Sequence, residues 1–239
     1  MDRFSIVTID AYLDQIGTQR LVQFGLCHIF FNSKYLDYFD SSQYSLVVEY
    51  KGFSVYSLCL DVKKSIHIAF IRNGASLSAI DFECLIHLGF NEFIIWGFCC
   101  SIGECNIGDL VIVNKAYIGE GVSKYYDKDV EFANPSIELN QRILDCLKPK
   151  RTIIPVSCFS TEALFMETER LIINLKNQNI DCIDMECSAL ASIAEYRNVK
   201  MSCLFSVSDT IRLCQWNRAN DIDLRRILID SLFCLYPED

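Results

Sequence analysis

The amino-acid sequence predicts a single α/β domain in which helices cover both faces of a mixed central sheet, a three-layer α/β/α arrangement. Two observations predict it. Short apolar, β-branched and aromatic segments alternate with segments of helical periodicity along the chain. The 239 residues are 51% hydrophobic, enough for one sizeable core, and no Pro- or Gly-rich linker divides them. We therefore expect one domain over residues 1–239, in which residues 1–20 form an N-terminal extension.

The first part of the chain is predicted to be rich in strands. β-Branched and aromatic residues cluster at residues 21–31, 43–61 and 65–71. The second cluster is split by Lys51-Gly52, which indicates a hairpin and makes the sheet mixed. A helix is expected from residue 76 to Gly89, because apolar residues recur on one helical face before that glycine. That face comprises Ile80, Cys84, Leu85 and Leu88.

Strands and helices then alternate to the end of the chain. Buried-strand patterns occupy residues 92–100, 108–118, 151–160, 180–185 and 199–209. Helical patterns occupy residues 136–148, 165–178, 187–197 and 222–236. This alternation is typical of a mostly parallel sheet, in which ligands bind beyond the carboxyl ends of the strands. Polar segments follow several of these strands, at residues 72–76, 97–109, 160–165, 184–187 and 206–212. We expect them to converge on one site.

Charge and composition restrict the partners. The formal net charge is −9 and the basic residues are scattered, so we expect a small-molecule ligand and no nucleic acid. The charged N-terminus does not resemble a signal peptide, and no apolar run approaches the roughly 18 residues of a membrane span, so no membrane partner is expected. The thirteen cysteines show no repeated metal spacing, and an odd number cannot all pair within the chain, which indicates a reducing compartment. We expect a cytoplasmic protein that uses no metal or other cofactor.

Three segments resemble the nucleoside phosphorylase and nucleosidase superfamily. They are "IDMECSAL" followed by "FSVSD" (183–190 and 205–209), "IGDLVIVNKAYIGEGVSKYY" (107–126) and "FSTEALFMETER" (159–170), which is similar to the loop that covers the base in that family. The resemblance extends from about Leu21 to Leu235. It implies the mixed-sheet fold of the superfamily, a nucleoside as the ligand, and a homo-oligomer, a dimer or larger, in which a neighbour's side chains complete each pocket.

The resemblance assigns the sugar site to the Met-Glu pair. It implies that Glu186 accepts hydrogen bonds from the ribose hydroxyls and that Met185 packs against the sugar. A carboxylate suits this role because its two oxygens can receive two vicinal O–H donors. Two simpler interpretations remain open: Glu186 is favoured by the macrodipole of a helix that begins there, and Met185 fills a gap in the core.

The base site is assigned in the same way. The resemblance implies that Asp209 protonates or hydrogen-bonds the departing base, with help from Arg212 and Ser208. The alternative is that Ser208 and Asp209 cap the next segment. The base is expected to lie against a wall formed by Leu164, Phe165 and Ile183. For Leu164 and Phe165 the alternative is simple packing within their loop.

Residues 168–170 bear on the choice of base. Thr168 stands where pyrimidine-cleaving members keep a glutamine, and Arg170 is only half of the pyrimidine-binding pair. Because Asp209 also resembles the acid of purine-cleaving members, a purine is favoured, and Arg170 is interpreted as surface charge.

The phosphate site implied by the resemblance is degenerate. "FNSKY", which ends at Tyr35, replaces a Gly-x-Pro-x-Arg loop, while Ile95 and Phe98 replace the arginine and the Ser or Thr of the second phosphate loop. Gly97 is retained. Apolar groups cannot compensate a buried phosphate dianion. The other candidate donors are Lys34, Ser76 and Ser123.

Three functions remain open. The favoured hypothesis is cleavage of the N-glycosidic bond of a purine or modified nucleoside without ordinary phosphate, as in nucleosidases. Only His28, Asn32 and Asp37 are available near the first strand to hold the attacking water, and none matches the family pattern cleanly. The alternatives are a phosphorylase with an unrecognised phosphate site and a non-catalytic nucleoside-binding or regulatory homologue.

Overall fold

The computed structural model describes residues 8, 9, 13, 25–50, 52–61, 64–213, 215–220 and 222–236. Most of the predicted extension (1–20), residues 21–24 of the first predicted strand and Lys51 of the predicted hairpin turn lie outside the described residues. The division of the chain into an extension and one domain therefore stays a prediction.

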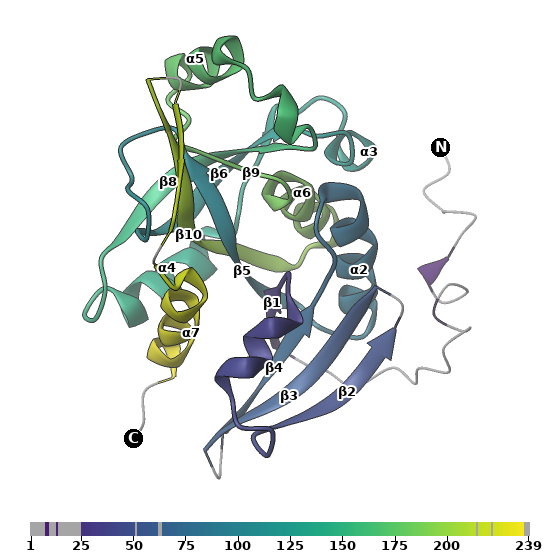
Figure 1. Cartoon of the computed structure of the whole chain (residues 1–239). Coiled ribbons are helices and arrows are strands. Elements are labelled where there is room, and N and C mark those ends of the chain that lie inside the picture. The colour runs from purple at the N-terminus through teal and green to yellow at the C-terminus, as the bar shows by residue number, and fades with distance from the viewer. Residues whose placement is uncertain are drawn as a thin grey trace.

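The described strands form one mixed sheet (Figure 1). Their order is β11-β10-β6-β8-β9-β5-β1-β4-β3-β2, with β7 paired to β6. The strands are β1 (Leu26–Phe30), β2 (Tyr44–Tyr50), β3 (Phe53–Asp61), β4 (Lys64–Phe70), β5 (Glu92–Ser101), β6 (Leu110–Gly119), β7 (Phe132–Ala133), β8 (Ile153–Thr161), β9 (Cys182–Asp184), β10 (Lys200–Arg212) and β11 (Gln215–Arg218).

One end of the sheet closes on itself. β10 pairs in parallel with β5 along most of its length, and its residues 204–206 also pair antiparallel with β6. Because β6, β8, β9 and β5 are paired in that order, these four strands and β10 form a closed ring, and β1, β4, β3 and β2 continue from it as an open sheet. A neighbouring run of strands, β4-β1-β5-β10, is entirely parallel, so their carboxyl ends lie at one edge.

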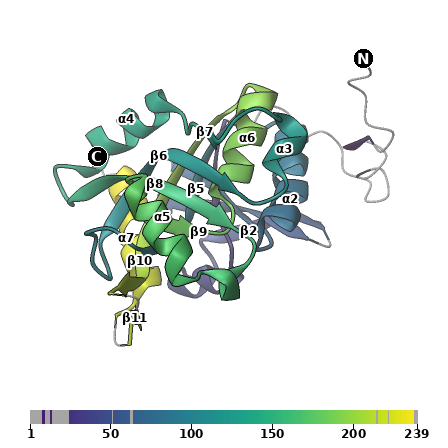
Figure 2. The same ribbon diagram turned by 90° about the horizontal axis from the view of Figure 1, so that it is seen from above.

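Helices cover both sides of the strands, as the views in Figures 1 and 2 show. α2 (Ala75–His87), α3 (Ser123–Tyr126) and α6 (Cys187–Arg197) pack together over one hydrophobic cluster. α4 (Ile137–Leu147) and α7 (Leu224–Leu235) pack together over a second cluster. α5 (Glu169–Asn177) buries Ile172 and Leu175 in a third, smaller cluster. The mixed α/β fold predicted from the sequence is confirmed.

The structure corrects some details of the predicted helices. Ile80 does not lie on the buried face of α2: its side chain is 42% exposed, while the other three predicted residues, Cys84, Leu85 and Leu88, are buried. Asp81 and Glu83 are buried instead, because they pair with Arg72 and Arg197. α5 begins at Glu169, later than predicted, because the Thr168 side chain accepts a hydrogen bond from the Leu171 N–H and caps the helix there. The preceding residues form the short 3₁₀ helix η3 (Leu164–Met166).

Candidate active site

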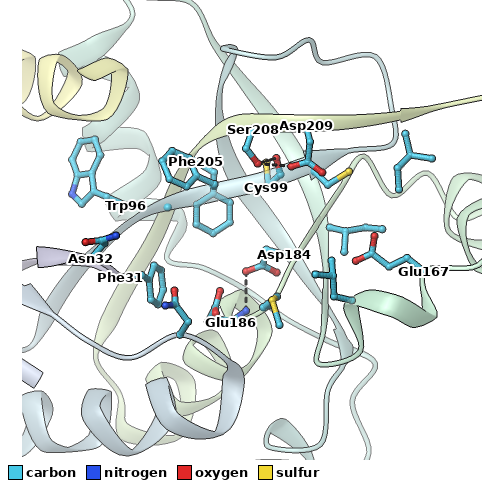
Figure 3. Close-up of a pocket in the computed structure, with 18 of the residues that line it drawn as sticks. Phe31, Asn32, Trp96, Cys99, Glu167, Asp184, Glu186, Phe205, Ser208 and Asp209 are labelled. Carbon is cyan, nitrogen blue, oxygen red and sulfur yellow. Dashed lines mark hydrogen bonds between the residues drawn. The ribbon is translucent and has the colours of Figure 1, made fainter. Parts of the chain in front are cut away.

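A cavity of about 570 Å³ opens at the carboxyl ends of β1, β5, β9 and β10 (Figure 3). This volume lies within the usual range for small-molecule sites, roughly 300–1,000 Å³. The polar segments predicted to converge do contribute to its lining, through Asn73, Gly97 to Cys100, Leu164 and Phe165, Asp184 to Glu186, and Ser208 and Asp209. The expected position of the site, at the strand ends, agrees with this arrangement.

Asp184 and Glu186 stand at the junction of β9 and α6. The Asp184 carboxylate accepts hydrogen bonds from the backbone N–H groups of Glu186 (3.0 Å) and Cys187 (2.7 Å), and from the Ser160 hydroxyl (2.5 Å). Asp184 is thus the acid that satisfies the first N–H groups of α6. The Glu186 side chain makes no capping hydrogen bond and is directed to the cavity.

Glu186 is held by the loop between β4 and α2. Its Oε1 accepts a hydrogen bond from the Gly74 N–H at 2.6 Å. Gly74 has φ +85°, a backbone conformation that favours glycine. The loop is fixed in turn by Asp81, whose carboxylate receives the backbone N–H (3.0 Å), Nε (3.0 Å) and Nη2 (2.6 Å) of Arg72.

Burial, and then the nearby Asp184 carboxylate, raise the pKa of Glu186 to about 7. Burial also raises the pKa of Asp184. Glu186 therefore changes charge near neutral pH, and a ligand that donates hydrogen bonds to it favours its charged form. Met185, beside it, also lines the cavity.

The other predicted base-site residues lie on the wall formed by β10 and the loop before α5. Asp209 is inside β10 and does not cap a helix. Its Oδ1 accepts a hydrogen bond from the Ser208 hydroxyl (2.5 Å), and its Oδ2 accepts one from the Trp216 indole N–H (2.7 Å). Ile183 also lines the cavity from β9. Leu164 and Phe165 line the cavity too, but they are 53% and 96% exposed, so loop packing does not explain them.

Two residues of this wall were not identified as site residues from the sequence. Trp216 comes from β11, a short strand that was not predicted, and Glu167 precedes α5. Burial, and then the Asp209 carboxylate, raise the pKa of Glu167. An isolated tryptophan in the polar segment after Ser208-Asp209 was a signal for the first residue; no comparable signal marks Glu167.

Arg212 is not among the residues that line the cavity. Its guanidinium donates hydrogen bonds to the backbone carbonyls of Ser101 (3.0 Å) and Cys105 (2.6 Å). Arg212 is the last residue of β10 and lies beyond the residues of that strand that line the cavity. Its hydrogen bonds tie the end of β10 to the loop after β5. A direct role in catalysis does not fit this position.

The comparisons with known proteins identify the family of the chain. The sequence profile described as "Phosphorylase superfamily" matches residues 48–223, more than half of the chain. The chain belongs to the phosphorylase superfamily. It is 27% identical over 133 residues to an uncharacterized protein of Acanthamoeba polyphaga mimivirus, covering 55% of this chain and 51% of that one. It is 22% identical over 140 residues to a guanosine phosphorylase of Halorubrum lacusprofundi, covering 58% of each chain. The matches thus span little more than half the length of these relatives.

Of the superfamily phosphate positions considered above, three line the cavity and one does not. Tyr35, Gly97 and Phe98 line it. Ile95 is fully buried in the core, paired with Ile29 of β1 and Cys203 of β10, short of the strand end where the cavity opens. An added Cβ at Gly97 would approach the rings of Phe205 and Phe31 at 3.3 Å, so glycine is suited to this close packing.

The structure places most of the remaining predicted donors away from the cavity. Asn32 lines the cavity. Ser76 donates a hydrogen bond to Glu162 (3.1 Å) and Ser123 donates one to Glu120, and neither serine lines the cavity. His28 is fully buried between Trp96 and Tyr236. Four further predicted residues are exposed and do not line the cavity: Lys34, Asp37, Thr168 and Arg170.

Arg225 is the one lysine or arginine among the described residues that lines the cavity. It comes from the first turn of α7, which packs against the 3₁₀ helix η2 (Ser33–Tyr38). η2 carries Tyr35, whose buried hydroxyl has no hydrogen-bond partner among the described residues. Sequence reasoning missed Arg225 because it lies in a helix whose pattern indicates only packing.

Within the described ranges, no helix combines the length and the apolar character that crossing a bilayer requires. The same residues hold no cluster of three or more histidine, cysteine or acidic side chains arranged for a metal ion.

Proposed function

We propose that this protein cleaves the N-glycosidic bond of a purine or modified nucleoside, with water in place of phosphate as the acceptor. One observation supports this most: a cavity of nucleoside size brings Glu186 together with two further carboxyl groups, Asp209 and Glu167, that face it from other elements. Membership of the phosphorylase superfamily supports the same class of reaction.

Each group has a task in this proposal. Charged Glu186 accepts hydrogen bonds from the 2′ and 3′ hydroxyls, and Met185 packs beside the sugar. Ile183, Leu164 and Phe165 lie along the base. The acidic groups next to the base supply the hydrogen bonds and the proton that a departing purine needs, since a purine anion is a poor leaving group.

The choice of water rests on the character of the cavity next to the sugar. Phe31, Phe98 and Phe205 contribute rings there. Of the phosphate-loop residues compared through the resemblance, Gly97 is the one retained. Phosphate dianions need cationic forks or several N–H donors, and an apolar wall leaves their charge uncompensated. Water needs neither.

Phosphorolysis is the second candidate function, and Arg225 favours it. The Arg225 guanidinium lies at the same cavity as the Tyr35 hydroxyl, which has no partner in the described part of the chain, and together they offer hydrogen-bond donors to an anion. The relative named guanosine phosphorylase supports the same alternative.

Release of free base from a panel of nucleosides, with and without phosphate, tests the proposal. We expect phosphate neither to accelerate base release nor to raise the melting temperature, and the sugar product to be free ribose. Phosphate-dependent release of ribose 1-phosphate, reduced by Arg225→Gln, would establish the second candidate instead. Nucleoside binding without turnover under all conditions would identify a non-catalytic homologue.

A further inference from the structure

The hydrogen bonds of Asp209 leave it badly placed to donate a proton to the base. Oδ2 receives the Trp216 indole N–H, a group that can only donate, so the lone pair of Oδ2 that accepts this hydrogen bond cannot carry a proton. Oδ1 faces the Ser208 hydroxyl. If that hydroxyl turned to the Cys99 carbonyl, 3.3 Å away, a proton on Oδ1 would point at Ser208 and not into the cavity. Asp209 is built to accept hydrogen bonds.

Glu167 has the opposite surroundings. Its carboxyl lines the cavity, and within the described part of the chain it has no hydrogen-bond or ion-pair partner. Figure 3 shows this side chain directed into the cavity from the loop before α5, with Asp209 above it on β10. Two acidic groups at one site do not both ionise easily, and the group without donors retains the proton.

We propose that Glu167 is the general acid that protonates the departing base, while Asp209 remains a carboxylate that accepts a hydrogen bond from the base. This inference rests on the proposed function and identifies the residue that supplies the proton to the base. The effect of burial and of Asp209, which together raise the pKa of Glu167, is in the direction that this role requires.

The step balances with water as the second substrate. The bond between C1′ and the base nitrogen breaks, and its electron pair stays with the base. A base nitrogen takes the proton of the Glu167 carboxyl, which becomes a carboxylate. The oxygen of water bonds to C1′ and loses one proton to solvent, from which Glu167 is protonated again.

The pH profile follows from the groups that share the cavity. Glu167 must be protonated, so the rate falls as pH rises above its pKa, whereas Glu186 must be charged, so nucleoside binding weakens as pH falls below about 7. The described titratable and charged groups that line the cavity with Glu167 are Tyr35 on η2, Cys99 and Cys100 on β5, Asp184 and Glu186 at the β9–α6 junction, Asp209 on β10 and Arg225 on α7.

The test compares Glu167→Gln with Asp209→Asn on two substrates, with Glu162→Gln, an exposed acid of the same loop, as the control. The first substrate is guanosine or inosine. The second is 7-methylguanosine, whose base leaves as a neutral molecule and needs no proton. For Glu167→Gln we expect the rate to fall at least about 100-fold on the first substrate, with loss of the high-pH decline, and by less than about threefold on the second.

Other outcomes overturn the inference. If Glu167→Gln retains the high-pH decline and Asp209→Asn loses it, Asp209 is the acid. If Glu167→Gln is equally impaired on both substrates while its melting temperature is unchanged, the residue binds the base and does not protonate it.

A second measurement does not depend on turnover, so it separates this inference from the proposed function. Calorimetry of free guanine or hypoxanthine binding should show an affinity that falls as Glu167 loses its proton, and Glu167→Gln, which cannot lose one, should abolish that decline. Base binding by the wild type that does not change with pH contradicts the inference even if no nucleoside is cleaved. Failure of the wild type to cleave any nucleoside contradicts the proposed function.

Discussion

Asp184 and Glu186 are two residues apart, yet their surroundings give them different tasks. Asp184 receives the N–H groups at the start of α6, which leaves Glu186 free to face the cavity. The macrodipole interpretation of Glu186 therefore applies better to Asp184. Nothing in the order of the residues decides between the two acids, because the choice depends on where α6 begins relative to β9.

Replacing Glu186 by Gln should weaken ribonucleoside binding by about 1–3 kcal/mol, the usual value of a hydrogen bond to a charged group, and leave the melting temperature nearly unchanged. Isothermal calorimetry measures the affinity, and Glu162→Gln is the control because Glu162 is exposed and does not line the cavity. Unchanged affinity for ribonucleosides would exclude Glu186 from the sugar site.

The affinity should also depend on pH. Because the pKa of Glu186 is about 7 without ligand, and diol donors prefer its charged form, binding should weaken by up to about tenfold per pH unit as pH falls below 7. A 2′,3′-dideoxynucleoside, which lacks the donors, should not show this part of the dependence. Equal pH profiles for the two ligands would contradict the assignment.

The residues of the site divide into those that the sequence could reveal and those that it could not. Glu186, Met185, Ser208 and Asp209 follow buried strands in recognisable order, so their position at the strand ends could be predicted. Trp216 could not, because its four-residue strand is too short to show a pattern. Arg225 could not either, because the amphipathic pattern of α7 indicates only packing. Ile95 was assigned to the phosphate site only because it corresponds to a superfamily position, and its place inside β5 buries it.

At the scale of elements, the long helices and strands were predicted, and two of the shortest strands were not. α4 and α6 were predicted within about two residues, whereas β7 and β11 were missed because a strand of two or four residues has too few side chains to show alternation. Closure of the strands through β10 was not predicted either. It depends on β10 pairing with β5 and β6 together, which is a property of the whole sheet and not of one segment.

The loop between β4 and α2 offers a test at this scale. Asp81→Asn removes the charge that holds three donors of Arg72, and we expect it to lower the free energy of unfolding by about 1–3 kcal/mol. It should also weaken ribonucleoside binding, because Gly74, two residues after Arg72, donates the hydrogen bond that holds Glu186. Glu138→Gln, which removes one end of an exposed ion pair with Lys200, should leave both quantities nearly unchanged. Loss of stability without loss of affinity would separate the loop from the sugar site.

For the whole molecule we expect self-association. Leu164, Phe165 and Trp216 line the cavity and are 53%, 96% and 62% exposed, an unusual concentration of large apolar side chains at one place on a monomer. Sedimentation at micromolar concentration should show a dimer or a larger assembly, and Phe165→Ser should shift it toward monomer. A wild-type chain that sediments only as a monomer would contradict this expectation.

The stability of the whole fold should depend on pH through His28. This residue is fully buried and joins β1, β5 and the end of α7: its Nδ1 accepts the Trp96 indole N–H at 2.9 Å, and its Nε2 lies 2.7 Å from the Tyr236 hydroxyl. Since an indole N–H can only donate, the ring must be neutral with its proton on Nε2. Burial, and then Arg142, lower the pKa of His28 to about 3.

The sign of this contribution follows from proton linkage. Between pH 6.5 and 3 the unfolded chain binds a proton at His28 and the folded protein does not, so the stability due to this residue is fully present above pH 6.5 and is lost as pH falls below it. Glu186, whose folded pKa is raised, contributes in the opposite direction between pH 4.5 and 7, so the wild-type curve alone does not isolate His28. The difference between wild type and His28→Gln does. In urea unfolding we expect that difference to shrink by an amount on the order of 1 kcal/mol for each pH unit below 6.5. A difference that stays constant from pH 7.5 to 5 would show that His28 takes up its proton at the same pH in the folded protein as in the unfolded chain, which its contact with Trp96 does not permit.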